Sequence, residues 1–220
     1  MKRTTYILLI HIIFSVFIPA QENSGFKIAR LKYNGGGDWY NDPSSEINLL
    51  KYISEKTSIK IDMKTTFVEA GNPDIFNNPF IFITGHGNIS LSDQEAANLR
   101  SYIEKGGFIY ADDDYGFDKS FRKALKKIFP EDNLVEIPFS YGIYNCFYKF
   151  NSGPPKTHEH DNNPPRGYGL FINGRLAVYY TYESNPSDGW ADPEVHNDPA
   201  DIREKALQFG TNIIIWALTN

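Results

Sequence analysis

The stretch that decides the fold is Gly107-Phe108-Ile109-Tyr110-Ala111-Asp112-Asp113-Asp114-Tyr115-Gly116, a short apolar run that leads into three adjacent carboxylates and a glycine turn. Two other places have the same form: Pro79–Ile83 leads into Thr84-Gly85-His86-Gly87, and Phe26–Tyr33 leads into Asn34-Gly35-Gly36-Gly37-Asp38-Trp39-Tyr40. Short apolar runs are typical of strands that are covered on both faces. As neighbouring parallel strands, the three runs would bring their polar turns to one edge, where open α/β sheets bind ligands.

Helical patterns alternate with these strands. A helix start at Asp42-Pro43 precedes an apolar stripe, and Ser92 with Glu95 forms a capping box before a second helix. Asp118 is placed to cap a third helix that Pro130 closes, and Ile59–Met63 has the composition of a short strand. The alternation predicts an α/β fold with a mostly parallel sheet.

The later part of the chain has a different pattern. Asn173-Gly174 lies between two apolar runs, Leu170–Ile172 and Leu176–Tyr182, which predicts a β-hairpin. Two long polar loops, 151–167 and 183–199, flank this hairpin, and loops of that length in a compact domain are usually functional lids or disordered. A final helix follows Asp198-Pro199. We expect residues 21–220 to form a single domain.

The N-terminus has the features of an export signal. Lys2 and Arg3 precede an apolar stretch of 13 residues, Tyr6–Ile18, and Pro19-Ala20 offers a cleavage position. Because a membrane-spanning helix needs roughly 17 to 25 residues, the sequence predicts a signal peptide at residues 1–20 and an exported protein, periplasmic or extracellular, with no stable span after cleavage. A retained anchor is the alternative.

Charge and cysteine content exclude two classes of function. Removal of residues 1–20 leaves 20 basic against 27 acidic residues, a net charge of −7, which argues against nucleic-acid binding. The lone cysteine, Cys146, has aromatic and apolar neighbours that favour a buried, unreactive thiol, and it lacks the glycines of a nucleophile elbow. We therefore do not expect a covalent Ser or Cys hydrolase.

The aspartate triplet is the first candidate for chemistry. Adjacent carboxylates repel one another unless a cation, amide donors or water compensates them, and hard divalent cations prefer such ligands. Asp112 and Asp114 would share one side of an extended strand and are the candidate metal ligands, while Asp112, Asp113 and His86 are the candidate catalytic residues. The alternative is structural: the carboxylates fix the turn at Tyr115-Gly116.

Further residues are candidates for ligand binding. Amides at the glycine turns can hold an anion, and the rings nearby can stack on a ligand. Arg175 and Trp190, from the hairpin and the last loop, could reach the same ligand. Each has a structural alternative as a turn, packing or surface residue. The set is Gly36, Gly37, Asp38, Trp39, Tyr40, Gly85, Asp114, Tyr115, Arg175 and Trp190.

One more segment resembles a metal-binding tract by composition, namely His158-Glu159-His160-Asp161. It lies in a Pro-rich loop, and we expect a solvated loop there in preference to a site.

Several motifs in fixed order resemble a bacterial family called domain of unknown function 4159. They include Leu31–Tyr40, Thr84-Gly85-His86, Gly106–Asp113, Asn173–Val178, Gly189-Trp190 and Gly210–Ile214, and the resemblance covers nearly all of residues 26–219. The family is similar to the class I glutamine amidotransferase-like superfamily, which implies a flavodoxin-like three-layer sandwich, here with a C-terminal β-hairpin. In true amidotransferases the turn after the central strand carries a nucleophilic cysteine. Asp112-Asp113 occupies that turn here, so the resemblance does not imply Cys-dependent amidotransferase chemistry.

Three hypotheses for function follow. The first is an exported domain that binds a small polar ligand, sugar-like in character, at the carboxyl ends of the strands. The second is a hydrolase that depends on carboxylates or a divalent cation and uses Asp112, Asp113 and His86. The third is a non-enzymatic subunit of a cell-envelope assembly, with the hairpin and long loops as its contact surface.

Overall fold

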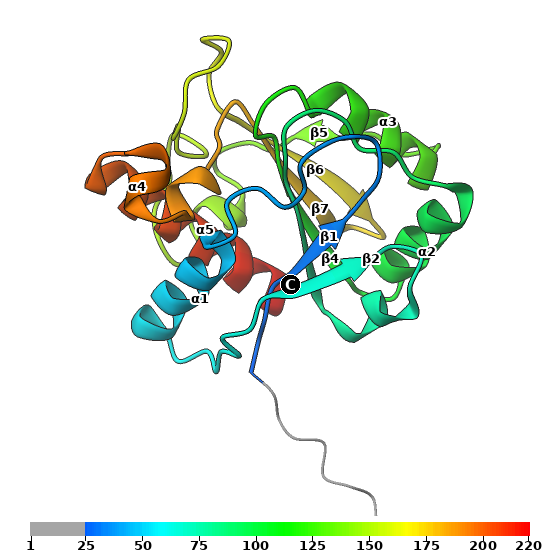
Figure 1. Cartoon of the computed structure of the whole chain (residues 1–220), viewed down its shortest axis with the longest axis horizontal. Coiled ribbons are helices and arrows are strands. Elements are labelled where there is room, and N and C mark those ends of the chain that lie inside the picture. The colour runs from blue at the N-terminus through cyan, green and yellow to red at the C-terminus, as the bar shows by residue number, and fades with distance from the viewer. Residues whose placement is uncertain (1–24) are drawn as a thin grey trace, which may run out of the picture.

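The computed structural model describes residues 25–220, so the predicted signal peptide at residues 1–20 lies outside the described part of the chain. Within these residues, seven strands form one sheet in the order β2-β1-β3-β4-β7-β6-β5 (Figure 1). β2, β1, β3, β4 and β7 are parallel neighbours, whereas β6 and β5 pair antiparallel at one side. The strands are β1 (Ala29–Lys32), β2 (Thr66–Glu69), β3 (Phe80–Ile83), β4 (Phe108–Asp112), β5 (Val135–Glu136), β6 (Arg166–Ile172) and β7 (Arg175–Tyr182).

The three apolar runs of the sequence form adjacent parallel strands, as predicted. β3 lies between β1 and β4, with Arg30 opposite Phe82 and Phe82 opposite Tyr110. β7 extends the same parallel set on the other side of β4, where Ala111 lies opposite Tyr180. With β2, five parallel strands therefore end at one edge, which we call the carboxyl edge, and the polar turns meet there.

Helices cover both faces of the sheet (Figure 1). α2 and α3 pack on one face, and α1 and α5 pack on the other. Neighbouring strand residues alternate between the two cores: Ile81 and Ile109 belong to the first, whereas Phe82 and Tyr110 belong to the second. The arrangement is compatible with a flavodoxin-like sandwich. The α-helices are α1 (Ser45–Lys56), α2 (Asp93–Glu104), α3 (Asp118–Ile128), α4 (Pro193–His196) and α5 (Ala200–Thr219), and the 3₁₀-helices are η1 (Pro73–Asn77), η2 (Gly142–Tyr144) and η3 (Asp188–Trp190).

The predicted hairpin is confirmed. β6 and β7 pair from Arg166–Tyr182 to Ile172–Arg175, and Asn173 and Gly174 connect them with φ values of 52° and 81°. Positive φ at both central residues is what a tight hairpin turn of type I′ requires. Because β7 runs toward the carboxyl edge, this turn lies at the opposite edge of the sheet.

The strand predicted at Ile59–Met63 is wrong. Ile61 makes a single bridge to Phe26, and the outer strand is β2 instead. The Phe26 amide donates to the Lys60 carbonyl at 2.7 Å, and its carbonyl accepts from the Asp62 amide at 2.8 Å. Pairing stops there because β1 begins only at Ala29, where its partner on this side is Thr66.

Of the capping residues predicted for helix starts, Asp42 does not cap α1, whose N-cap is Ser44, and two others have different outcomes. The capping box of Ser92 and Glu95 is present at α2. Asp118 is the first residue of α3 and not its cap, and the side chain that holds the helix start is Asp113, whose Oδ1 accepts from the Phe117 amide at 3.0 Å. Asp118 instead accepts from Arg122 Nε at 2.7 Å and from the Tyr180 hydroxyl at 2.9 Å.

The helices of the described residues differ from membrane-spanning helices in length or polarity. Between residues 25 and 220, every helix is too short or too polar to span a bilayer.

Candidate metal centre

The turns after β1 and β3 meet at a pair formed by His86 and Asp38. The His86 amide donates to Asp38 Oδ1 at 2.5 Å, and His86 Nδ1 lies 3.1 Å from Asp38 Oδ2. The same ring nitrogen lies 3.1 Å from Asp114 Oδ2 in the turn after β4. His86 is half exposed whereas Asp114 is buried, so the pair forms the rim of a site whose floor is Asp114.

The glycines of these turns allow their backbones to pack closely. A Cβ on Gly37 would lie 2.8 Å from the His86 carbonyl oxygen, and a Cβ on Gly85 would collide with the Tyr33 hydroxyl. The Gly37 amide donates to Asn88 O at 2.9 Å and is therefore already occupied. These glycines serve close approach of the chain, which was the structural alternative for them, while Gly36 faces open space.

A buried arginine fixes the turn after β1. Arg30 Nη2 donates to Glu46 Oε2 at 2.7 Å, and Arg30 Nη1 donates to the carbonyl oxygens of Trp39, at 3.1 Å, and Asn41. The turn then presents Asn41 and Asp42 to the edge. Asp42 adopts φ 43°, a left-handed conformation that costs energy for a residue other than glycine and that is found more often at functional sites.

The three consecutive aspartates have different surroundings. Asp112 accepts from Thr181 Oγ1 at 2.5 Å, from the Ser187 amide at 2.9 Å and from Ser187 Oγ at 2.6 Å. Asp113 holds the start of α3 and accepts from the Tyr180 hydroxyl at 3.2 Å. Burial raises the pKa of Asp112 to about 7 and that of Asp113 to about 6. Both carboxyls are engaged by the protein, and Asp113 also lines a cavity with Tyr115.

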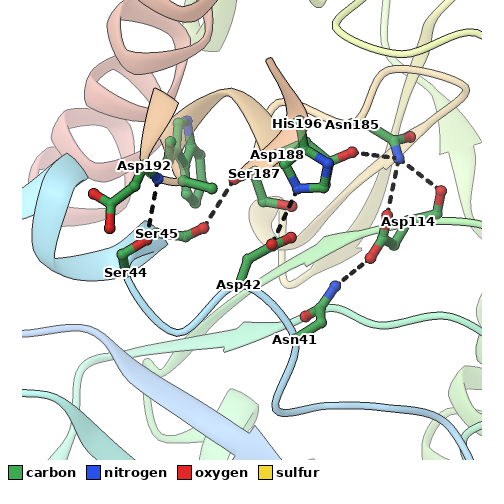
Figure 2. Close-up of polar contacts among 12 residues, drawn as sticks. Asn41, Asp42, Ser44, Ser45, Asp114, Asn185, Ser187, Asp188, Asp192 and His196 are labelled. Atoms are coloured by element: carbon green, nitrogen blue, oxygen red, sulfur yellow. Dashed lines mark hydrogen bonds and ion pairs between the residues drawn. The ribbon is translucent and has the colours of Figure 1, made fainter. Parts of the chain in front are cut away.

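Asp114 alone of the triplet belongs to the site. Its Oδ2 accepts from Asn41 Nδ2, and its backbone oxygen and Oδ1 accept from Asn185 Nδ2 at 2.6 and 3.2 Å (Figure 2). Burial, and then the negative charges of Asp188 and Asp112, hold the pKa of Asp114 well above its usual range. This carboxyl therefore sits in a pocket with an excess of negative charge.

The two long loops supply the other half of the site. His158, from the first loop, lies with Nδ1 2.7 Å from Asp188 Oδ2 and with Nε2 3.1 Å from Asp198 Oδ1. His196, at the end of α4, lies with Nε2 3.0 Å from Asp42 Oδ1. The two imidazole rings are 4.9 Å apart. Hydrogen bonding to Asp188 raises the pKa of His158 to about 8, against the opposing effect of burial.

Two groups of three side chains could each hold a metal ion. The first is His158, Asp188 and His196, and the second is Asp42, Asp114 and Asp188. In each group the candidate ligand atoms all lie within 4.8 Å of one another. Figure 2 shows Asp42 directed at His196, with Asp188 and Asp114 facing Asn185.

Some buried oxygens of this region have no hydrogen-bond partner among residues 25–220. They are Asp188 Oδ1, Asp198 Oδ2 and Asn185 Oδ1. Buried polar atoms are nearly always satisfied, because an unsatisfied one costs about 1–3 kcal/mol. Each of these oxygens is free to accept a hydrogen bond or to bind a cation.

The aromatic residues predicted to bind a ligand lie at different distances from the site. Tyr115 stacks on His160 with ring centroids 4.7 Å apart and lines a cavity of about 320 Å³ beside the site. Tyr40 is exposed and packs its ring edge-on to Trp39, which also contacts Phe67, away from the carboxylates.

Two candidate residues, Trp190 and Arg175, do not lie on the surface of the carboxyl edge. Trp190 is buried in the core under α5, and its Nε1 donates to the Ala206 carbonyl at 2.8 Å. Arg175 lies at the opposite edge of the sheet, where its Nη2 donates to the carbonyls of Ile103 and Gly107 at 2.8 and 3.1 Å. The structure does not bring either side chain to the site.

Cys146 is exposed, so the expectation of burial was wrong. The residue follows η2, and its thiol donates to the Asn212 carbonyl at 3.3 Å. Desolvation nevertheless raises the pKa of the thiol above its usual value, which disfavours a reactive thiolate.

The sequence interpretation missed most of the ligand-type residues that meet here. Asp42 and Asp198 were assigned only to helix starts, His158 was assigned to a solvated loop, and Asp188 and His196 were not singled out. The signal that could have found them is the length of the two loops together with their content of His and Asp.

The comparisons with known proteins identify the family. Residues 27–218 match the model of the family described as Domain of unknown function (DUF4159), and the chain belongs to this family. A comparison with curated proteins gave no match.

Proposed function

We propose that this member of the DUF4159 family is a metal-dependent hydrolase in which His158, Asp188 and His196 hold a divalent cation. The observation that supports the proposal best is the meeting of these three side chains, from two separate loops, at the carboxyl edge of the sheet. Open α/β sheets place their ligands at this edge.

The spacing suits a metal ion. Three atoms bound evenly to one ion at about 2.1 Å each lie about 3.0–3.6 Å from one another. A spacing of up to 4.8 Å therefore closes with shifts on the order of 1 Å, which side-chain rotation can supply. Two imidazoles and one carboxylate suit Zn²⁺, Mn²⁺ or Fe²⁺ better than Ca²⁺.

The neighbouring carboxylates support this role for the histidines. Histidine ligands usually donate their second ring nitrogen to a carboxylate, which fixes the ring orientation. Asp198 lies 3.1 Å from His158 Nε2 and leaves Nδ1 for an ion beside Asp188. Asp198 is thus a positioning residue.

The chemistry that this centre supports is the addition of water to an ester or phosphoester. A bound cation lowers the pKa of its water molecule and polarises the substrate oxygen. The water oxygen forms a bond to the carbonyl carbon or phosphorus, the bond to the leaving oxygen breaks, and the leaving oxygen takes up a proton. His86, exposed at the rim beside Asp38 and Asp114, is placed to transfer protons in this step.

The test compares two histidines of the same loop. We expect His158→Gln to lose bound Mn²⁺ or Zn²⁺, measured by mass spectrometry of the dialysed protein, and to lose hydrolysis of p-nitrophenyl phosphate or acetate. His160→Gln, which alters a histidine outside both groups, should keep the wild-type metal content. Wild-type protein that retains no metal after dialysis against either ion would refute the proposal.

Binding of a small polar ligand without turnover is the second candidate. It is favoured by the cavity of about 320 Å³ beside the site, whose lining includes Tyr115, Lys119 and Glu183. A metal-loaded protein that binds sugars or phosphate in calorimetry but hydrolyses none of the esters would support this function. A protein that binds none of these and copurifies with an envelope protein would support the third hypothesis, a non-enzymatic assembly subunit.

Two proposals concern the chain as a whole. We propose membership of the class I glutamine amidotransferase-like superfamily, supported by the parallel order β1-β3-β4 and by the turn that follows β4. We also propose export, supported by the sequence of residues 1–20. N-terminal sequencing of protein from the native cell should then begin at Gln21, and a retained Met1 would contradict export by cleavage.

A further inference from the structure

We propose that the site holds two divalent cations rather than one, with the second bound by Asp42 and Asp114 and with Asp188 bridging the pair. The inference rests on the proposed function, because the first cation is the one held by His158, Asp188 and His196.

The first argument is that the two groups share one residue. Asp188 belongs to both sets of ligand-type side chains, and the candidate atoms of each set lie within 4.8 Å of one another. Hydrolases with two metal ions hold them about 3.5–4 Å apart, a separation that one bridging carboxylate spans. The loop after β7, residues 183–199, places Asp188 between His158 on one side and Asp114 on the other.

The second argument is independent of the clustering. The Asp188 side chain is 1% exposed, and its Oδ1 has no hydrogen-bond partner among residues 25–220. Its Oδ2 lies 2.7 Å from His158 Nδ1 and accepts from Asn185 Nδ2 at 3.4 Å, and the same Asn185 nitrogen donates to Asp114 Oδ1, so this carboxylate lies between the two groups. A bridging carboxylate offers one oxygen to each ion, and Oδ1 is the oxygen of Asp188 that no hydrogen bond among residues 25–220 occupies.

The charges around the second group favour a cation there. The ion pairs of Asp42, Asp114 and Asp188 are with His196, His86 and His158, respectively. Asp114 and Asp188 are buried, and among residues 25–220 no lysine or arginine forms an ion pair with any of the three carboxylates. The second group also consists of carboxylate oxygens alone, which suit Mg²⁺ or Mn²⁺.

Two cations change the class of substrate that the edge accepts. Without metal, the carboxylates repel an anion. With two divalent cations bound by three carboxylates and two neutral imidazoles, the centre carries a net positive charge. Two-metal centres of this kind clamp the attacking and leaving oxygens of a phosphoryl group. We therefore infer a phosphoester as the substrate class.

The experiment counts manganese ions in the full-length protein after chelation and reloading. We expect about two Mn²⁺ per chain by mass spectrometry and an electron paramagnetic resonance spectrum of an exchange-coupled pair. Asp114→Asn should reduce the content to about one and remove the coupling, while Asp201→Asn, on the exposed side of α5, should leave both unchanged. Binding of inorganic phosphate to the Mn²⁺-loaded protein should weaken at least tenfold in Asp114→Asn.

The outcomes separate the two proposals. A wild-type content of one, unchanged in Asp114→Asn, would overturn the second cation and leave the proposed function standing. A content of zero would overturn both. Two ions without exchange coupling would refute the bridge, and this measurement on wild-type protein decides the matter even where the variant does not fold.

Discussion

The short turns after β1, β3 and β4 differ from the long loops 151–165 and 183–199 in how they hold their functional side chains. These turns place Asp38, His86 and Asp114 six, three and two residues beyond the ends of their strands, tied by backbone contacts and glycines. The long loops place His158, Asp188 and His196 through polar side-chain contacts. The comparison indicates a centre of which one half is built into the sheet and the other half is docked upon it.

The largest effect should come from breaking the half that is built into the sheet. Arg30→Met leaves Glu46 buried without its partner, and removal of one member of a buried ion pair costs about 3–5 kcal/mol. We expect a loss of that size in the free energy of unfolding, measured by urea denaturation.

A second variant separates the ion pair from the turn. In Arg30→Met with Glu46→Leu no unpaired charge remains, so most of the stability should return. Metal affinity should stay low, because the carbonyls of Trp39 and Asn41 still lack their donor. Full recovery of metal affinity would show that Arg30 does not position the turn that carries Asp42.

A smaller effect should come from releasing the docked half. Asp112→Ala removes the acceptor of the Ser187 amide, the Ser187 hydroxyl and the Thr181 hydroxyl, all buried. Unsatisfied buried donors predict a loss of about 3 kcal/mol. Hydrogen exchange should accelerate in residues 183–199 and stay unchanged in α2, and equal acceleration in both would contradict local docking.

The smallest effect is a dependence on pH in metal-free protein. The pKa of His158 rises from 6.5 to about 8 on folding, so its stabilisation is complete below pH 6.5 and is lost as the pH rises through 8. A shift of this size corresponds to about 2 kcal/mol. Asp112, whose pKa is raised to about 7, acts in the same direction, because the folded state keeps a proton that the unfolded state has released.

The measurement is chemical denaturation in chelator at pH 6.5 and pH 8. Wild-type protein should lose stability over this interval, and His158→Gln should lose less. An identical loss of stability in both proteins would mean that the Asp188–His158 pair does not contribute to the pH dependence of unfolding.

The sequence predicted the central sheet well because its strands are apolar on both faces and its turns carry glycines. Phe80–Ile83, Phe108–Ala111 and the Asn173-Gly174 turn have patterns that depend only on neighbours along the chain. Ile59–Met63 was mistaken for a strand because its residue types suit both a full strand and a segment that makes a single β-bridge. Among residues 25–220, it makes only the single bridge between Phe26 and Ile61. β2 was missed because only Val68 of its four residues is buried.

The site was predicted only where strand ends determine it. His86, Asp38 and Asp114 meet as the parallel order requires. Asp112 and Asp114 are not held by the same groups, because Asp112 is bound by Thr181 and Ser187 whereas Asp114, two residues further on, is bound by Asn41 and Asn185. Asp188 and His196 could not be placed, since their positions depend on long-range contacts with His158 and Asp42.

The hairpin carries the chain away from the carboxyl edge along β6 and back along β7. This round trip delivers the His158 loop and the Asp188 loop to one place, although some thirty residues separate them along the chain. The reversal point at Asn173-Gly174 is therefore the part of this excursion farthest from the metal ligands. A fluorescent label or affinity tag inserted there would report on the protein from the far pole without touching the chemistry.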